Sequence, residues 1–185
     1  MLPRLKVKSL FRRISLAPLG ISFDELKDIV LHSHYHEAQQ RNPLYPGVRK
    51  ALTLWHAAGR PIMIATSRPP VVQKETAIWL CSKRIPISTI AFVKDKLAYA
   101  CHYKAIVIID DRPDVLQDGP PEFLCGAVKQ LWHRESAGMF NGEHVVVADN
   151  WKELYHKLNR KIEARLKATE EGQRGPEASL ATTAT

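Results

Sequence analysis

Two adjacent carboxylates, Asp110 and Asp111, end an apolar run in the stretch AIVIIDDRPDVL at residues 105–116. A short run rich in Val and Ile predicts a strand buried on both faces, as in a parallel sheet. Ligand sites in such sheets lie at the carboxyl ends of the strands. Neighbouring carboxylates repel each other, and a hard cation such as Mg²⁺ offsets that repulsion. The alternative is a strand followed by an Asx turn or a helix cap, because Asp and Pro are both common in turns.

Hydroxyl groups follow a second predicted strand, in the segment PIMIATSRPP, where the strand at 61–65 is followed by Thr66, Ser67 and Arg68. Hydroxyls and backbone N–H groups at the start of a loop between a strand and a helix form an anion site, and the helix adds its positive end. The alternative is that Thr66 or Ser67 only caps that helix. Lys96 follows a third predicted strand and stands near a helix start, where a cation is disfavoured. A role in binding would explain that position, and a solvated surface lysine is the alternative.

Strands and helices alternate along the rest of the chain, which predicts an α/β fold with a parallel sheet and helices on both faces. Ser22 and Glu25 form a capping box at the start of the first predicted helix. The predicted helices cover residues 22–42, 48–59, 71–84, 96–103 and 151–167, and the predicted strands cover 61–65, 88–95, 105–110, 127–133 and 144–149. We expect a basic flank at 1–20, one domain at 21–168, and a disordered tail rich in Gly, Pro, Thr and Ala at 169–185.

Length and composition are those of an ordinary globular domain, with 185 residues of which 45% are hydrophobic and 25% charged. No apolar run approaches the roughly 20 residues that cross a bilayer, so no membrane partner is expected. The three cysteines are scattered, which favours reduced thiols and a cytoplasmic location over disulfides or a zinc site. The basic start, which precedes the first acidic residue Asp24, leaves an organelle targeting peptide as the less favoured alternative.

The excess of basic residues, 27 Lys and Arg against 19 Asp and Glu, gives a net charge of +8 and favours anionic partners. A basic nucleic-acid-binding module is one alternative, but zinc spacing, an aromatic RNA-binding motif and a helix-turn-helix pattern are all missing from the sequence. His32 and His36 lie one helical turn apart, with His34 and Glu37 nearby, which suggests a metal pair. A solvated helix face explains these histidines better, because the sequence places no further ligand.

The order of these groups resembles the haloacid-dehalogenase-like phosphohydrolases, in which a hydroxyl residue, a lysine and an acidic pair follow successive strands. The segments LYPGVRKALTLWHAAGRPIMIATSRP, FVKDK with AIVIIDDRPDVL, and NGEHVVVADNWKELY are most similar to the 5′(3′)-deoxyribonucleotidase branch. The resemblance covers roughly residues 43–158. It implies a Rossmann-like sheet, a small helical cap remnant at about 21–45, and a magnesium-dependent hydrolase. Its substrate would be a phosphorylated small molecule such as a deoxynucleoside monophosphate. A homodimer is a further possibility that the sequence does not decide.

Carried over residue by residue, the resemblance gives each group a role in phosphoryl transfer. Thr66 and Ser67 would bind the phosphoryl oxygens, and Lys96 would neutralise charge on the phosphate. Asp110 and Asp111 would hold Mg²⁺, so that Lys96 and Asp110 are the catalytic candidates. This division of roles is physically sensible, because phosphoryl transfer depends mostly on positioning and on charge stabilisation.

The sequence departs from the family at its start, where a central strand should end in Asp-x-Asp and supply the nucleophile. The acidic residues before Thr66 are Asp24, Glu25, Asp28 and Glu37, and all of them fall in the predicted helix at 22–42. Loss of that strand would leave two buried strands without ladder partners, which is costly. Three explanations stay open: a true start upstream of Met1, a degenerate relative that binds phosphate or a partner without turnover, or filling of the gap by RLKVKSLF at 4–11. In each case we expect little or no phosphatase activity from the chain as written.

Overall fold

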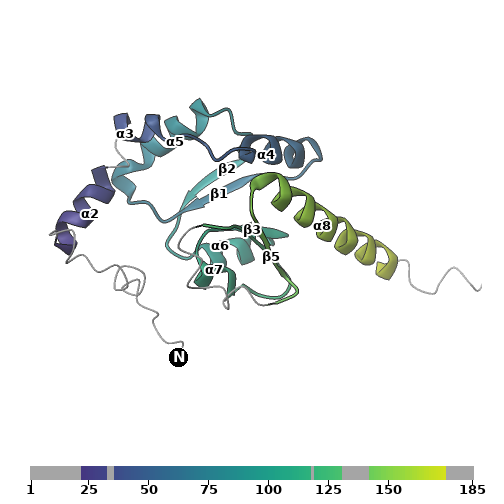
Figure 1. The fold of residues 1–185 in the computed structure, drawn as a ribbon. Helices are drawn as coiled ribbons and strands as arrows, with labels where there is room; N and C mark the ends of the chain where they lie inside the picture. Colours follow the sequence, from purple (N-terminus) through teal and green to yellow (C-terminus); the bar gives the residue numbers. More distant parts are fainter. Residues whose placement is uncertain (1–21, 33–35, 118, 131–141, 174–185) are drawn as a thin grey trace, which may run out of the picture.

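The structure is a computed structural model, which describes residues 22–173 apart from 33–35, 118 and 131–141 (Figure 1). Its strands are β1 (Met63–Thr66), β2 (Thr89–Phe92), β3 (Val107–Ile109), β4 (Leu124–Val128) and β5 (Val145–Ala148). Its helices are α2 (Phe23–His32), α3 (His36–Arg41), α4 (Val48–Ala57), α5 (Gln73–Ser82), α6 (Lys96–His102), α7 (Pro113–Gln117) and α8 (Trp151–Gln173), with a 3₁₀ turn, η2, at Pro70–Val72.

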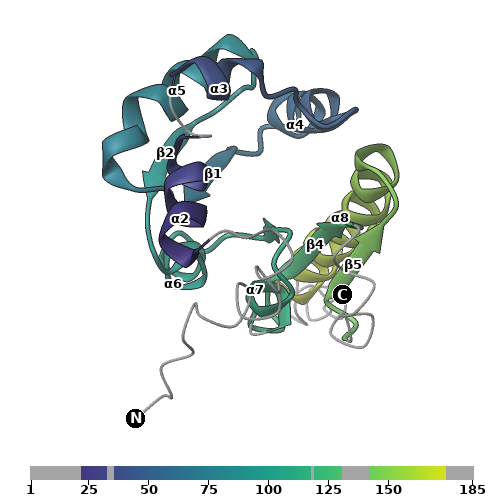
Figure 2. The ribbon, with the colours of Figure 1, turned by 60° about the vertical axis from the view of Figure 1, so that its left-hand side comes forward.

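The strands form two parallel sheets, which confirms the α/β class, but the prediction of a single continuous sheet was wrong, because β1 and β3 form no ladder. β1 pairs with β2 in one sheet, and β3, β4 and β5 follow one another in the second. The strands predicted at 61–65 and 105–110 therefore lie in different sheets. Figure 2 shows β1 and β2 on one side of the molecule and β4 and β5 on the other.

One edge of β1 has no ladder partner among the described strands. The carbonyl oxygen of Thr66 accepts the N–H of Val93 at 2.9 Å. Along a strand, the backbone groups of successive residues point to opposite edges. Ile64 and Thr66 therefore point their backbone groups to β2, whereas Met63 and Ala65 point theirs to the open edge.

β3 also has an open edge, on the side away from β4. The N–H of Asp110 donates to the carbonyl of Gly126 at 3.1 Å, and the N–H of Leu124 donates to the carbonyl of Ile106 at 2.9 Å. By the same alternation, the backbone groups of Val107 and Ile109 point away from β4. Among the described strands, β1 and β3 thus each have one edge without a ladder partner, as do the outer strands β2 and β5.

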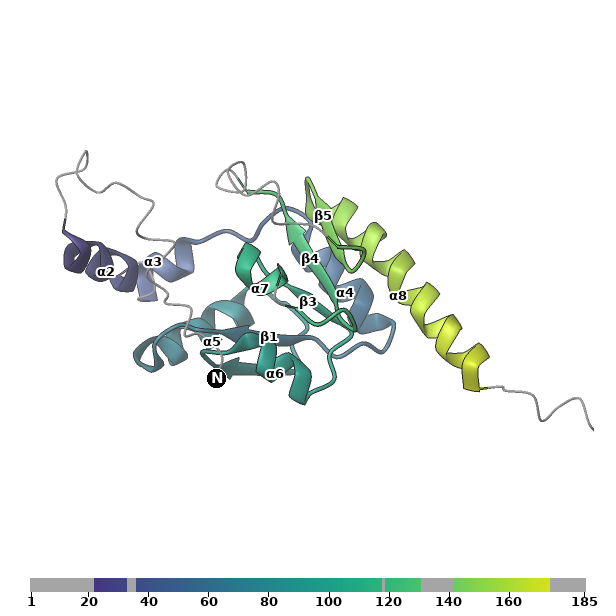
Figure 3. The ribbon, with the colours of Figure 1, turned by 90° about the horizontal axis from the view of Figure 1, so that it is seen from below.

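A shared hydrophobic core joins the two sheets although they exchange no ladder. We call its larger part the α4–α8 cluster; its buried members are Val48, Ala51, Leu52, Trp55, Ile62, Leu124, Val146, Ala148, Leu154, Leu158 and Ile162. Ile64 from β1 and both Val107 and Ile109 from β3 pack against it. The other part, the α6–α7 cluster, consists of Ala100, Leu116, Phe123, Cys125 and Ala127. Helices therefore cover both faces of the strands (Figure 3).

Burial of the strands follows their pairing. In β4, which pairs on both edges, every residue except Val128 is buried. All residues of β1 and β3 are only partly buried, although their sequences, MIAT and VII, are strongly apolar. β1 and β3 are therefore less buried than their apolar sequences would lead one to expect, and each of them has an open edge among the described residues.

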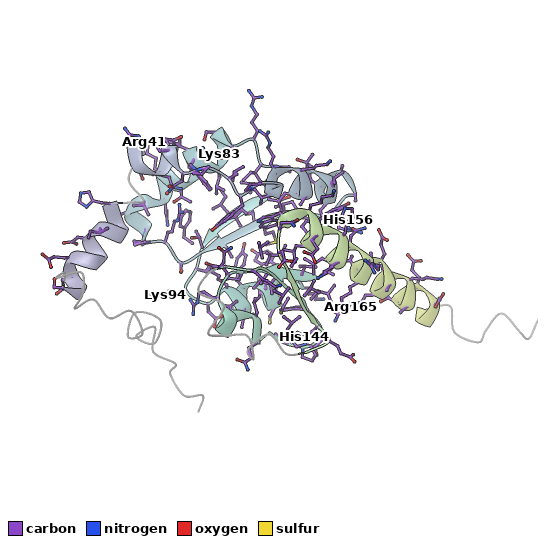
Figure 4. The ribbon with its side chains drawn as sticks, viewed as in Figure 1. Arg41, Lys83, Lys94, His144, His156 and Arg165 are labelled. Carbon is purple, nitrogen blue, oxygen red and sulfur yellow. The ribbon has the colours of Figure 1, made fainter. Side chains whose placement is uncertain are left out.

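Local sequence signals explain several helix boundaries. The capping box is confirmed, because the N–H of Ser22 donates to Glu25 Oε2 at 2.7 Å and the N–H of Glu25 donates to Ser22 Oγ at 3.2 Å. The helix predicted at 22–42 is described as α2 and α3, with 33–35 outside the description. α3 packs against α5, where Trp79 Nε1 donates to the carbonyl of Asn42 at 3.0 Å. Lys83, which follows α5 and is labelled in Figure 4, donates from Nζ to the carbonyl of Gln40 at 3.2 Å.

Two predicted boundaries were wrong. The strand predicted at 127–133 begins earlier, since β4 covers Leu124–Val128, because its pairing with β3 and β5 extends towards Leu124. Residues 169–173, which were predicted to begin a disordered tail, are helical, since α8 continues to Gln173, and Glu and Gln are good helix formers. The basic flank at 1–20, His34 and residues 174–185 lie outside the described residues.

None of the helices in the described part of the chain has the length and apolar character needed to cross a membrane. All three cysteines are free thiols: Cys81 and Cys101 are exposed, and Cys125 is buried. Burial raises the pKa of the Cys125 thiol, which keeps that thiol protonated and unreactive.

Candidate functional site

Lys96 and Asp110 form the centre of the candidate site. The Lys96 Nζ atom lies 2.6 Å from Asp110 Oδ2, and the two side chains are only 17% and 5% exposed. Lys96 is the first residue of α6, just beyond β2, and Asp110 directly follows β3. The two sheets therefore meet through this ion pair at the carboxyl ends of their strands, which is where the sequence placed a ligand site.

The second carboxylate oxygen of Asp110 is also used. Asp110 Oδ1 accepts the N–H of Arg112 at 3.0 Å, which is an Asx turn. This turn precedes α7. Asp110 therefore has the turn-forming role that the sequence analysis gave as the alternative to a metal site. It does not exclude a role in binding, because Asp110 Oδ2 faces a cation.

Lys96 occupies a helix start, where a positive charge is normally unfavourable. Asp95 caps α6, since its Oδ1 accepts the N–H of Ala98 at 2.9 Å. The negative charges of Asp95 and Asp110 offset the cost of placing the ammonium there. The sequence singled out Lys96 but not its pairing with Asp110 nor the cap at Asp95, although an Asp before a predicted helix is a readable N-cap signal.

Asp111 is the more exposed of the two carboxylates. Its pKa is raised, first by partial desolvation and then by the negative charge of Asp110; Lys96 opposes the shift. A raised pKa means that the charged form of Asp111 is disfavoured in the folded chain. A bound cation would relieve that cost.

Thr66 and Ser67 lie at the end of β1, in the other sheet. Thr66 Oγ1 accepts the N–H of Arg68 at 3.3 Å, and Ser67 is exposed. Within the described residues, neither hydroxyl is hydrogen-bonded to Lys96 or Asp110. α6 does pack against β1, so the hydroxyls and the ion pair belong to neighbouring elements. Their convergence on one phosphate stays a prediction.

Arg68 does not face the ion pair. Its guanidinium donates to Thr76 Oγ1 at 3.2 Å and lies 6.0 Å from the centre of the Trp79 ring. Burial lowers its pKa. Arg68 therefore packs the loop after β1 against α5 instead of adding charge to the candidate site.

The carboxylate oxygens of Asp110 and Asp111 are of the type that binds Mg²⁺ in proteins. Mg²⁺ is usually held by one or two carboxylates, with water and substrate phosphate completing its shell. Among the described residues there is no group of three or more His, Cys, Asp or Glu side chains that could hold a metal. Two adjacent carboxylates, one with a raised pKa, fit a magnesium ion completed by water and phosphate, and they do not fit a site built from protein ligands alone.

An apolar hollow lies elsewhere, near the start of β3. Its lining includes Ile106, Phe123 and Arg165. Arg165 Nη2 is already hydrogen-bonded to the carbonyl of Pro121 at 3.0 Å. Because Ile106 precedes β3 and Asp110 follows it, this hollow is at the opposite end of the strand from the ion pair.

Comparison of the chain with protein-family models, with curated proteins and with solved structures finds no match. The family resemblance therefore depends on the residues themselves.

Proposed function

We propose that this chain binds the phosphate group of a small molecule together with Mg²⁺, as a relative of the haloacid-dehalogenase-like phosphohydrolases. The observation that supports this proposal best is the buried pair of Lys96 and Asp110 at the carboxyl ends of β2 and β3. The order of the site residues along the chain supports the nucleotidase branch, and a deoxynucleoside monophosphate is the substrate class to test first. In this proposal α2 and α3 correspond to the cap remnant.

Each residue would have a separate task. Asp110 and Asp111 would hold Mg²⁺, which would neutralise charge on the phosphate oxygens. Lys96 would exchange part of its contact with Asp110 for a phosphate oxygen, and a charged hydrogen bond of that kind is among the stronger contacts in proteins. Thr66 and Ser67 would donate hydroxyl hydrogen bonds from the neighbouring strand.

Asp111→Asn should abolish stabilisation of the chain by Mg²⁺. The substitution keeps the shape of the side chain and removes one of the two negative charges. Without Mg²⁺ the variant should melt at the same temperature as the parent or at a higher one. The reason is that asparagine removes the negative charge of Asp111, which the folded chain disfavours. With the metal at about 100 times its Kd, the parent should gain about 2.7 kcal/mol and the variant almost nothing. Thermal melting with and without MgCl₂ measures both quantities.

Glu163→Gln is the matched control for this experiment, because it makes the same charge change on the exposed side of α8, away from the site. Glu163→Gln should keep the full response to Mg²⁺. An equal response of the parent and Asp111→Asn would contradict a metal site at the acidic pair.

Turnover of the bound phosphate ester should be undetectable with this chain. Covalent phosphoryl transfer needs a nucleophile, and the Asp-x-Asp motif that supplies it in the resembling family does not occur before Thr66. We expect release of inorganic phosphate from deoxynucleoside monophosphates and MgCl₂ to stay at the level of a Lys96→Met variant. Calorimetry should still detect binding of the monophosphate. Magnesium-dependent release that disappears in Lys96→Met would show a working enzyme and would refute the binding-only proposal.

A further inference from the structure

We propose that the outer surface of α4 and α8 binds the phosphate backbone of double-stranded nucleic acid without reading its sequence. We call this surface the basic face; its members are Lys50 on α4, Arg60 just after α4, and Lys152, His156 and Arg160 on α8. The basic face is separate from the candidate site at Lys96 and Asp110, and the inference does not depend on the proposed function.

Most of the net positive charge of the chain belongs to these two helices. Residues 48–60 contain three Lys or Arg and no Asp or Glu, and residues 151–162 contain four Lys or Arg and one Glu. The two segments together have a net charge of +6, against +8 for the whole chain. A charge of one sign that gathers on neighbouring elements attracts partners of the opposite sign and speeds their association.

α4 and α8 lie side by side and run in the same direction, so that their charges share one surface (Figure 1). A Cβ on Gly47, the residue before α4, would lie 3.7 Å from the backbone nitrogen of Lys152. Further along both helices, Arg60 Nη1 donates to Asn159 Oδ1 at 2.6 Å. Lys50 follows Gly47 by one turn, and helix side chains tilt towards the N-terminus, so Lys50 tilts towards Lys152. The basic face is therefore continuous from one helix to the other.

The cations of the basic face are available to a partner. Lys152, His156 and Arg160 are spaced four residues apart, which places them on one side of α8. All three are exposed, as is Lys50; His156 is labelled in Figure 4. Among the described residues, the side chains of Lys50, Lys152 and Arg160 take part in no hydrogen bond or ion pair.

The acidic side chains of these helices leave the basic face positive. α4 contains no acidic residue. On α8, Glu153 Oε1 lies 2.6 Å from Lys157 Nζ, and Lys157 also donates to the carbonyl of Val147 in β5 at 3.1 Å, so this pair is directed towards the sheet. Glu163 borders the basic face at its far end, where Glu163 Oε1 accepts Asn159 Nδ2 at 2.6 Å.

The chemistry of the basic face fits a nucleic-acid backbone better than a lipid surface. Lys152 and Arg160 are separated by about 12 Å along α8, a length over which a DNA duplex presents about seven phosphate charges. A helix that lies on a membrane needs exposed apolar side chains beside its cations. The apolar side chains Leu154 and Leu158 of α8 are instead fully buried.

The same surface has no means of reading bases. Neither α4 nor α8 has an exposed Phe, Trp or Tyr side chain, which base stacking would need. Contacts from lysine and arginine to phosphates fix the position of a protein on a duplex but do not distinguish its sequences. We therefore expect two duplexes of unrelated sequence to bind with the same affinity within about twofold.

Fluorescence anisotropy with a labelled DNA duplex of about 20 base pairs, in buffer without Mg²⁺, measures the binding. Each phosphate that a cation neutralises contributes about −0.9 to the slope of log K against log[NaCl]. The four Lys and Arg side chains of the basic face should therefore give a slope of about −3.6 or steeper. A deoxynucleoside monophosphate, which lacks a row of phosphates, should not displace the duplex.

Lys152→Gln combined with Arg160→Gln should weaken binding at least tenfold and make the slope shallower by about two. The matched control is Lys74→Gln combined with Arg84→Gln, which removes the same two charges from exposed positions on α5 and just after it. Figure 2 shows α5 and α8 on opposite sides of the molecule. The control should bind within about twofold of the parent, and both double variants should keep the melting temperature of the parent, because they change exposed side chains.

Glu163→Gln gives a test in the opposite direction. It removes the negative charge that borders the basic face and should tighten binding about twofold or more. Equal weakening by the two double variants would show attraction by net charge alone and would overturn the basic face. Binding to phosphatidylserine vesicles without binding to DNA would assign this surface to a membrane and would also overturn the proposal. Because the duplex measurements use neither Mg²⁺ nor the candidate site, their failure is distinct from failure of the proposed function.

Discussion

Lys96→Met should lower the free energy of unfolding by about 3–5 kcal/mol, the usual cost of removing one partner from a buried ion pair. The Asp110 side chain is 5% exposed, so it would keep a charge in a place that water hardly reaches. Methionine fills nearly the same volume as lysine, and lost packing therefore contributes little. Urea unfolding at pH 7 measures the change.

Two further variants separate the ion pair from other effects. In Lys96→Met combined with Asp110→Asn no charge is left unpaired, and much of the lost stability should return. Lys94→Met removes an exposed lysine two residues earlier and should change stability by about 0.5 kcal/mol or less. If Lys96→Met cost no more than Lys94→Met, the pair would not be the buried contact described above.

Leu158→Ala should lower the free energy of unfolding by about 2–5 kcal/mol, the range measured for large-to-small changes in cores. Leu158 is fully buried on α8, within the cluster that both sheets share. The surrounding backbone of β4 approaches it closely, because a Cβ on Gly126 would lie 2.9 Å from Leu158 Cδ1. The cavity left by alanine would therefore remove contacts from both elements.

Leu166→Ala is the matched control for that experiment. Leu166 lies two turns further along the same helix and is 42% exposed, so its truncation should cost far less. The two sheets share one core, and a single urea transition with an unchanged slope is therefore expected for both variants. Separate transitions for the two sheets would contradict the shared core.

The sequence predicted the helices and strands from local signals, and these were largely confirmed. The capping box at Ser22, the strand ending at Asp110 and the helix starting at Lys96 are all properties of a few neighbouring residues. The boundary at residue 127 was wrong, because Cys125 and Gly126 have no strong local preference for a strand. β4 begins at Leu124 because it pairs with both neighbours, and such pairing is a long-range property.

The contact between Lys96 and Asp110 is a long-range property of the same kind. Residue types and spacing identified Lys96 and Asp110 separately, because each follows an apolar strand. Their direct contact depends on how two sheets pack, and no periodicity in the sequence encodes that distance. Arg68 follows the same strand as Thr66 in the sequence, but its guanidinium lies 6.0 Å from the centre of the Trp79 ring, a long-range contact that local sequence does not predict.

The pairing of α4 with α8 has a consequence for the order in which the chain folds during its synthesis. Arg60 Nη1 donates to Asn159 Oδ1 at 2.6 Å across 99 residues of sequence, and the rings of Trp55 and Tyr155 lie 5.1 Å apart. At roughly 5–20 residues per second, the apolar face of α4 would leave the ribosome on the order of 5–20 s before its partner helix. During that interval Val48, Leu52 and Trp55 lack the α8 side chains against which they pack in the folded chain, so we expect this apolar face to be prone to aggregation until α8 is synthesised.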